Sequence, residues 1–146
     1  MKKYSKYFLY LAWIQSLAAL FGSLYFSEIA HFPPCTLCWY QRIFMYPLAL
    51  LIPVGIFHKD RNLPYYVLPL SLLGTLVAFY HNLVYFQIIP DSLSPCAIGV
   101  SCTTKFIEFF GFVTIPFLSF LGFLFIDICM VLFIHNKNNI WGKPKA

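Results

Sequence analysis

Long apolar stretches separated by short polar segments dominate the hydrophobic pattern of this chain. A helix needs about 20 mostly apolar residues to cross a hydrocarbon core about 30 Å thick. Four stretches reach that length, and we expect each to be a membrane-spanning helix: Tyr7–Phe26, Trp39–Phe57, Tyr65–Phe86 and Phe112–Ile134. Their internal prolines do not divide them, because neighbouring helices satisfy the backbone groups that a proline frees in a membrane. The pattern predicts an all-α, integral membrane four-helix bundle, with residues 1–146 forming one domain that ends in a polar tail at 135–146.

The composition and the charge pattern support this prediction and add an orientation. Of the 146 residues, 60% are hydrophobic and 10% are charged, which is more apolar than a soluble domain. Eight of the ten Lys and Arg lie in the N-terminal segment, the segment between the second and third stretches, and the tail. Because basic segments stay cytoplasmic, we expect both termini inside and two loops, 27–38 and 87–111, outside. The net charge of +5 therefore reflects topology, and nothing indicates nucleic-acid binding.

The cysteines form one pair in each of the two loops expected to face outward. Cys35 and Cys38 lie in or beside the first loop, and Cys96 and Cys102 lie in the second. Disulfides persist outside the cytoplasm, so we expect the disulfides Cys35–Cys38 and Cys96–Cys102. Cys129 lies within the fourth stretch, where we expect a small buried apolar residue.

Three kinds of site can use the four paired thiols. A zinc site of four thiolates is disfavoured, because its ligands are usually two to four residues apart and five residues separate Cys96 from Cys102. We therefore expect no metal. Purely structural disulfides are also less favoured, because both would close short loops and cross-link stabilisation grows with loop length. Thiol–disulfide exchange fits best, because a C-x-x-C pair such as Cys35 and Cys38 is typical of a reactive disulfide.

The surroundings of Cys38 favour a thiolate and suggest an electron acceptor. Cys38 begins the second stretch, where the helix dipole favours an anion, and Arg42 lies one turn further on the same face. Because the sequence contains no nucleotide-binding or haem-attachment motif, a lipid-soluble quinone in an aromatic-lined site beside Arg42 is the expected acceptor. His81, at about the depth of Arg42, is a candidate proton donor to the reduced ring. A hydrogen bond between helices would explain His81 equally well.

The motif P-C-T-L-C-W-Y-Q-R at 34–42, together with the second cysteine pair and the four spans, resembles the DsbB family of disulfide bond formation membrane proteins. It looks most like the Gram-positive branch called BdbC. The resemblance implies a multi-pass cell-membrane enzyme that reoxidises an extracytoplasmic thioredoxin-fold oxidase (BdbD/DsbA-like). Electrons would pass through two cysteine pairs to a membrane quinone, with menaquinone expected, and so support disulfide formation in secreted proteins.

The same resemblance assigns roles to individual residues. It implies that Cys38 contacts the quinone, that Cys35 is its disulfide partner and that Arg42 lies beside the quinone. It further implies that Cys96 receives the attack of the partner protein and that Cys102 then attacks the Cys35–Cys38 disulfide. The second pair is closer in sequence here than in the best-known DsbB, so which of its two cysteines is attacked first stays open.

Two other functions remain possible from the sequence. An enzyme similar to vitamin K epoxide reductase also uses a C-x-x-C pair in a small helix bundle, but this chain lacks a second C-x-x-C. A non-enzymatic scaffold or small transporter would hold both disulfides as inert cross-links.

A few further residues carry expectations of their own. We expect Asp127, an acid within the fourth stretch, to be hydrogen-bonded or to reach water rather than to form a proton channel. Glu28 and His31 are expected to be solvated loop residues. The segment 103–112 can either lie along the membrane surface or begin the fourth stretch.

Overall fold

The structure, a computed structural model, describes residues 2–90 and 114–141, with side chains described for 6–90 and 114–136. These residues form α1 (Lys2–Leu24), the π-helical turn η1 (Tyr25–Ile29), α2 (Thr36–Phe57), α3 (Leu63–Tyr85) and α4 (Ile115–Trp141). All four α-helices are long and apolar enough to cross a membrane. Within the described ranges there is no strand, so the predicted all-α four-helix class is confirmed.

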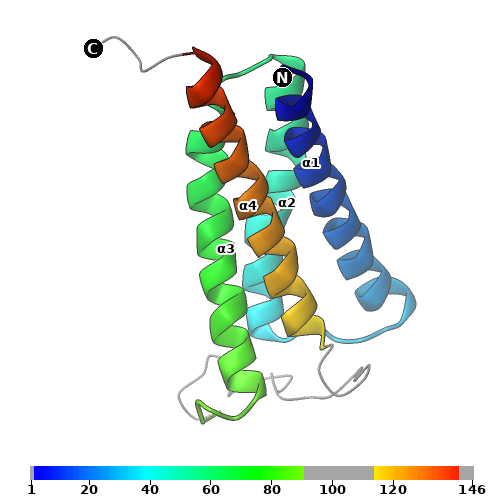
Figure 1. Cartoon of the computed structure of the whole chain (residues 1–146). Helices are drawn as coiled ribbons and strands as arrows, with labels where there is room; N and C mark the ends of the chain where they lie inside the picture. Colours follow the sequence, from blue (N-terminus) through cyan, green and yellow to red (C-terminus); the bar gives the residue numbers. More distant parts are fainter. Residues whose placement is uncertain (1, 91–113, 142–146) are drawn as a thin grey trace.

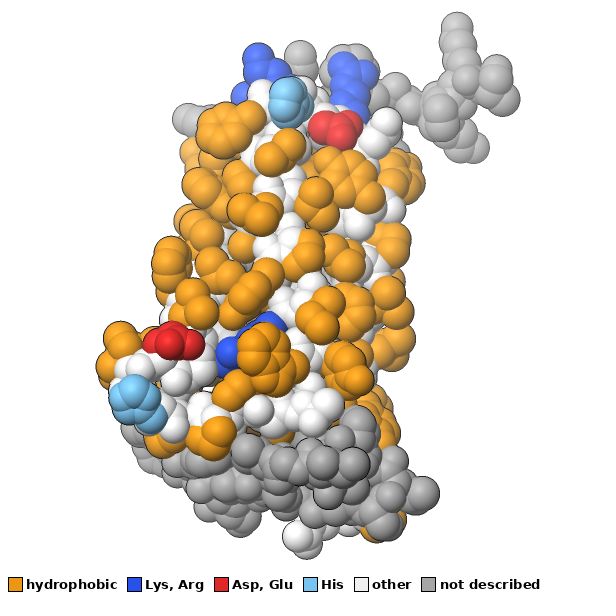
Figure 2. Space-filling model, turned by 180° about the vertical axis from the view of Figure 1, so that it is seen from behind, with side chains coloured by type: hydrophobic (Ala, Val, Ile, Leu, Met, Phe, Trp, Pro, Cys, Tyr) orange, Lys and Arg blue, Asp and Glu red, His pale blue; other side chains and the backbone are white. Residues whose placement is uncertain are grey.

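The four helices stand side by side and alternate in direction (Figure 1). α1 packs against α2 and α4, and α3 packs against the same two helices, whereas α2 and α4 touch only slightly across the diagonal. The start of α1, the α2–α3 connection and the end of α4 lie at one end of the bundle (Figure 1). Lys and Arg side chains gather at that end in Figure 2. Hence the three basic segments share one end, and the start of α2 lies at the other.

A core of interlocked apolar side chains fills the bundle, and the outer surface is also apolar. Phe123, Ile126 and Met130 of α4 are fully buried against residues of the other helices. Large apolar side chains such as Leu50 and Leu76 are mostly exposed, and Figure 2 shows that such side chains cover the length of the bundle. An apolar surface of this extent is unfavourable in water and suits a lipid environment.

Two buried polar contacts and one close approach join α3 to α4. Asp127 accepts hydrogen bonds from Ser71 Oγ and, at 2.6 Å, from Thr75 Oγ1. The expectation that this acid is hydrogen-bonded is therefore confirmed. Gly74, on the same face of α3, lies against the ring of Phe123, which occupies the space that a Cβ would need. Cys129 is 3% exposed, as expected for a small buried residue.

The helix ends differ from those that hydropathy indicated. α2 begins at Thr36 rather than Trp39, which places Cys38 in the first helical turn rather than in the loop. The reason is the N-cap, because Cys35 is extended (φ −71°, ψ 170°) and its sulfur accepts the Cys38 N–H. The first stretch continues through η1 to Ile29, beyond the expected end at Phe26. Hydropathy does not detect caps or π turns, since neither depends on apolar content.

Candidate functional site

Cys35 and Cys38 lie together at the start of α2. Both are free thiols, and their sulfurs are 3.0 Å apart, within hydrogen-bonding distance. The Cys38 backbone N–H donates to Cys35 Sγ at 3.4 Å. The C-x-x-C spacing produces this arrangement, because the N-cap side chain of a helix faces the N–H three residues later. The structure thus describes the reduced pair, and the Cys35–Cys38 disulfide stays a prediction for the oxidised protein.

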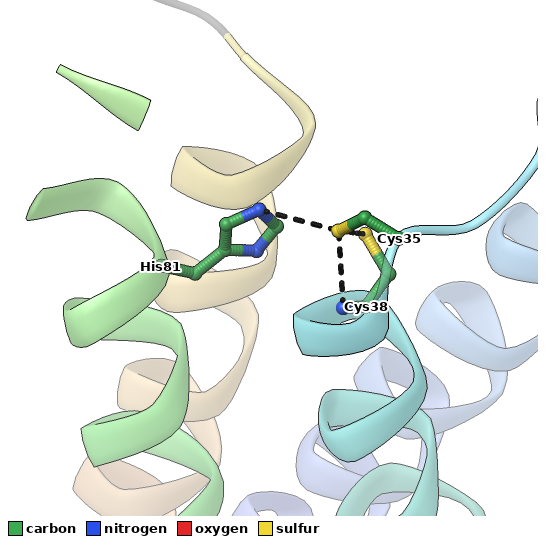
Figure 3. Close-up of side chains that lie close together, drawn as sticks. All are labelled: Cys35, Cys38 and His81. Atoms are coloured by element: carbon green, nitrogen blue, oxygen red, sulfur yellow. Dashed lines mark hydrogen bonds between the residues drawn. The ribbon is translucent and has the colours of Figure 1, made fainter. Parts of the chain in front are cut away.

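His81 approaches this pair from α3. Its side chain is 1% exposed, and its Nε2 lies 3.6 Å from Cys35 Sγ. Figure 3 shows the ring pointing from α3 toward this sulfur. We predicted His81 at about the depth of Arg42, and the structure places both residues in the wall of one cavity. The contact with Cys35 was not predicted, because it depends on how α3 is rotated about its axis.

Gln41 holds the other side of the His81 ring. Its Nε2 lies 3.0 Å from His81 Nδ1, and its side chain is buried. An amide nitrogen can only donate, so Nδ1 is the acceptor and the ring proton is on Nε2, directed at Cys35 Sγ. The sequence motif contained Gln41, but we gave it no role. The available signal was its position three residues after Cys38, which places both on one face of α2.

The reduced pair has its thiolate at Cys35, just before the membrane-spanning part of α2. The hydrogen bond with the Cys38 thiol lowers the pKa of Cys35 to about 4. Burial acts in the opposite direction, and the hydrogen bond from His81 lowers the pKa further. The sequence placed the thiolate at Cys38, beside the helix N-terminus and Arg42. In the reduced pair the polar contacts instead converge on Cys35, because the N-cap sulfur faces both the helix N-terminus and α3.

Arg42 connects α2 to the end of α1. Its Nη2 donates to the Ser23 carbonyl oxygen at 3.1 Å, just before the chain changes from α1 into η1. Its guanidinium carbon also lies 5.4 Å from the centroid of the Trp39 ring. A cation over an aromatic face is stabilised by the ring quadrupole. Arg42 is therefore held in place by α1 and by its own helix.

A cavity of about 360 Å³ opens beside these residues. Its volume lies within the range of small-molecule sites. Its walls are mostly apolar and come from α1, α2, α3 and α4, with a small number of polar groups. The chemically distinctive lining residues are Gln15, Cys35, Cys38, Gln41, Arg42, Tyr46, His81 and Tyr85.

The structure therefore gathers four of the predicted site residues, Cys35, Cys38, Arg42 and His81, around one cavity. The predicted pair Cys96 and Cys102 lies outside the described residues, as does the whole of the segment 103–112. Glu28, in η1, and His31, in the following loop, are exposed, in agreement with the expectation that they are solvated.

Comparison with known proteins points to one family. The family model described as "Disulfide bond formation protein DsbB" matches residues 5–134. The chain is 45% identical over 133 residues to "Disulfide bond formation protein C" of Bacillus subtilis, covering 90% of this chain and 95% of the relative. It is 46% identical over 127 residues to "Probable disulfide formation protein C" of Halalkalibacterium halodurans, covering 86% and 92%. "Probable disulfide formation protein C 1" of Bacillus anthracis is 44% identical over 137 residues, covering 93% and 98%. No solved structure matches the chain.

Proposed function

The chain belongs to the DsbB family of disulfide bond formation proteins, and on this premise we propose how its own residues oxidise a partner. It is a multi-pass membrane thiol oxidoreductase of the quinone-dependent kind, which reoxidises a thiol–disulfide partner. The family match favours this function over the vitamin K epoxide reductase-like enzyme and over the inert scaffold.

The position of the Cys35–Cys38 pair is the main support for this function. The Cys35–Cys38 pair lies in the wall of a mostly apolar cavity, and Arg42 and His81 line the same cavity. A dithiol in a water-poor pocket can pass electrons to an apolar acceptor, and the acceptor need not leave the membrane. A disulfide that served only as a structural cross-link would not need a cationic side chain and a hydrogen-bonding imidazole in that cavity.

The residues that line the cavity are suited to binding a quinone. Tyr46, Tyr85 and apolar side chains of α1 and α4 provide surfaces for a flat ring, and Gln41, Arg42 and His81 carry donors suited to carbonyl oxygens. A bound quinone supplies an acceptor for two electrons and two protons. We assign Arg42 to stabilise negative charge at this site and His81 to hold a proton on Nε2. We take menaquinone to be the quinone because the sequence resembles the Gram-positive branch.

The route begins at the second cysteine pair. A thiolate of a reduced, extracytoplasmic thioredoxin-fold oxidase attacks Cys96 of the Cys96–Cys102 disulfide, which releases Cys102 as a thiolate. The second thiol of the partner then attacks the mixed disulfide, so the partner leaves oxidised. Cys102 attacks Cys35, which forms a Cys35–Cys102 disulfide, breaks the Cys35–Cys38 bond and leaves the electron pair on Cys38, in the wall of the cavity. Cys96 then attacks Cys102, which restores the Cys96–Cys102 disulfide and releases Cys35, so the first pair is left reduced.

This route needs the first cysteine pair on the outer side of the membrane. The three basic segments lie at one end of the bundle, and the start of α2, which Cys35 caps, lies at the other (Figure 1). Because basic segments stay in the cytoplasm, we place both termini inside and both cysteine pairs outside. A membrane-impermeant maleimide applied to whole cells tests this orientation: a single cysteine introduced at Lys59 should stay unlabelled, and one introduced at His31 should be labelled.

Trapping of the mixed disulfide tests the first step. A partner that lacks its second thiol cannot release itself, so it should accumulate as a covalent adduct of the wild-type chain. Peptide mapping of this adduct should find the partner bonded to Cys96, because Cys96 is the sulfur that the partner thiolate attacks. A bond to Cys102 instead would reverse the two roles. An adduct on Cys129 would contradict the route.

A further inference from the structure

Two sulfurs and one imidazole nitrogen converge at the start of α2. Cys35 Sγ, Cys38 Sγ and a ring nitrogen of His81 all lie within 4.8 Å of one another. Cys35 and His81 are buried, and Cys38 is partly buried. Thiolates and imidazole are the ligands that bind Zn²⁺ most often, and C-x-x-C is a common spacing for two of them. From the sequence we considered only a site of four thiolates and expected no metal; the structure instead brings two of those cysteines together with His81.

We propose that the reduced Cys35–Cys38 pair and His81 form a binding site for a thiophilic divalent cation such as Zn²⁺. The site exists only in the reduced protein, because in a disulfide neither sulfur is a thiolate. A bound cation holds both sulfurs as ligands, so the pair cannot close to a disulfide until the cation leaves. The cation acts as a reversible blocker of the reduced enzyme and has no part in electron transfer.

The distances suit a tetrahedral site after a small movement. With Zn–S of about 2.3 Å and Zn–N of about 2.0–2.1 Å, a tetrahedral sulfur and nitrogen lie about 3.6 Å apart and two sulfurs about 3.8 Å apart. Cys35 Sγ and His81 Nε2 are already 3.6 Å apart. The sulfurs are 3.0 Å apart, so they must separate by about 0.8 Å. Cys38 Sγ, within 4.8 Å of the ring nitrogen, must also settle about 3.6 Å from it, and rotation of the half-buried Cys38 side chain moves this sulfur. The fourth position is left for water, as in zinc sites that keep an open position.

Gln41 supplies the partner that a ligating histidine requires. A metal-bound imidazole usually donates its other N–H to an acceptor, which fixes the ring. Gln41 now faces His81 Nδ1 with its nitrogen. Rotation of the amide by half a turn presents Oε1 instead, so Nδ1 can carry the proton while Nε2 binds the cation. On binding, the remaining thiol proton is released to solvent, which makes affinity rise with pH.

Binding of Co²⁺ and Zn²⁺ to the purified full-length protein tests the proposal. Cys96→Ser/Cys102→Ser should serve as the background, because it removes the other cysteine pair and leaves the site intact. After reduction with a phosphine, this protein should bind one equivalent of Co²⁺ with the visible absorption typical of tetrahedral thiolate coordination, and Zn²⁺ should displace it. The same protein oxidised to the Cys35–Cys38 disulfide should bind none. This comparison needs no further substitution, so misfolding cannot explain it.

Added substitutions then identify the ligands. His81→Ala and Gln41→Ala should each weaken binding by about 10-fold to 100-fold, the range for loss of groups around a metal. The control Cys129→Ser removes a buried thiol outside the cavity and should bind Co²⁺ unchanged. Equal absorption in reduced and oxidised protein would overturn the proposal, as would the absence of thiolate bands in reduced, folded protein. Because no quinone or partner is present, these outcomes do not depend on the proposed electron route.

A second readout links binding to the redox pair. One equivalent of Zn²⁺ should protect reduced Cys35 and Cys38 from oxidation by diamide, and a chelator should restore the oxidation. Oxidation at the same rate with and without Zn²⁺ would contradict the blocking effect.

Discussion

Gln41 and His81 meet between α2 and α3, where Gln41 Nε2 lies 3.0 Å from His81 Nδ1. Both side chains are buried, so neither can exchange this contact for bulk water. The contact decides which ring nitrogen carries the proton, and that proton faces Cys35 Sγ. Gln41 thereby determines that His81 presents an N–H, and not a lone pair, to Cys35 Sγ.

Replacing Gln41 should therefore slow quinone reduction, because His81 loses the contact that fixes its ring. Gln41→Leu removes the amide donor and leaves the ring free to adopt the other tautomer. A hydrogen bond of this kind contributes about 0.5–1.5 kcal/mol, so we expect the rate of quinone reduction to fall by about twofold to 13-fold. Gln41→Glu should also lower it, because a carboxylate accepts from Nδ1 and reverses the direction of the bond. Rates equal to wild type in both variants would show that Gln41 does not position His81.

The thiolate at Cys35 should be visible in a pH titration. In reduced Cys96→Ser/Cys102→Ser protein, the ultraviolet absorbance of the thiolate should persist from neutral pH down to about 4, because the pKa of Cys35 is lowered from 9.0 to about 4. His81→Ala removes one contribution to that lowering, so the pKa should rise and the absorbance should disappear at a higher pH. Loss of the thiolate near 9 in the protein with His81 would contradict the geometry.

Arg42 should act on quinone binding more than on the thiols. Arg42→Ala removes the charge that lines the cavity, so we expect a higher quinone concentration for half-maximal rate and a smaller effect on the maximal rate. Arg42→Lys retains a charge but not the planar donor set that reaches the Ser23 carbonyl, so its effect should be intermediate. An unchanged quinone dependence in Arg42→Ala would remove this assignment.

Asp127 should contribute to stability without affecting the chemistry. Asp127→Ala removes two hydrogen bonds between α3 and α4, and hydrogen bonds of this kind in membranes contribute up to about 2 kcal/mol each. We expect a loss of about 0.5–2 kcal/mol in the free energy of unfolding, measured by denaturation in detergent, with normal activity of the folded fraction. The control is Ile128→Ala, on the adjacent exposed face, which should change stability less. An equal loss in both variants would contradict a specific role for Asp127.

The sequence predicted the helices well because a membrane span is a local property. Apolar content and length identify each span without knowledge of its neighbours. The start of α2 was three residues too late in the prediction, because the cap depends on the conformation of Cys35 and not on hydropathy. The π turn after α1 was missed for the same reason.

The site could be predicted only in part. The positions of Cys38 and Arg42 on one helix follow from their spacing, and the depth of His81 follows from counting residues along α3. The contact of His81 with Cys35 and Gln41 depends on the rotation and distance of α3 relative to α2, which no short motif encodes. The location of the thiolate at Cys35 follows from these contacts and could not be inferred without them.

The central claim is that electrons reach quinone through the Cys35–Cys38 pair. It is tested most directly by following quinone absorbance without oxygen, after mixing the purified protein with a reduced thioredoxin-fold dithiol. Wild type and Cys129→Ser should consume quinone at similar rates, and Cys38→Ser should consume none. Equal consumption by Cys38→Ser and wild type, or none by either with the dithiol confirmed reduced, would contradict it.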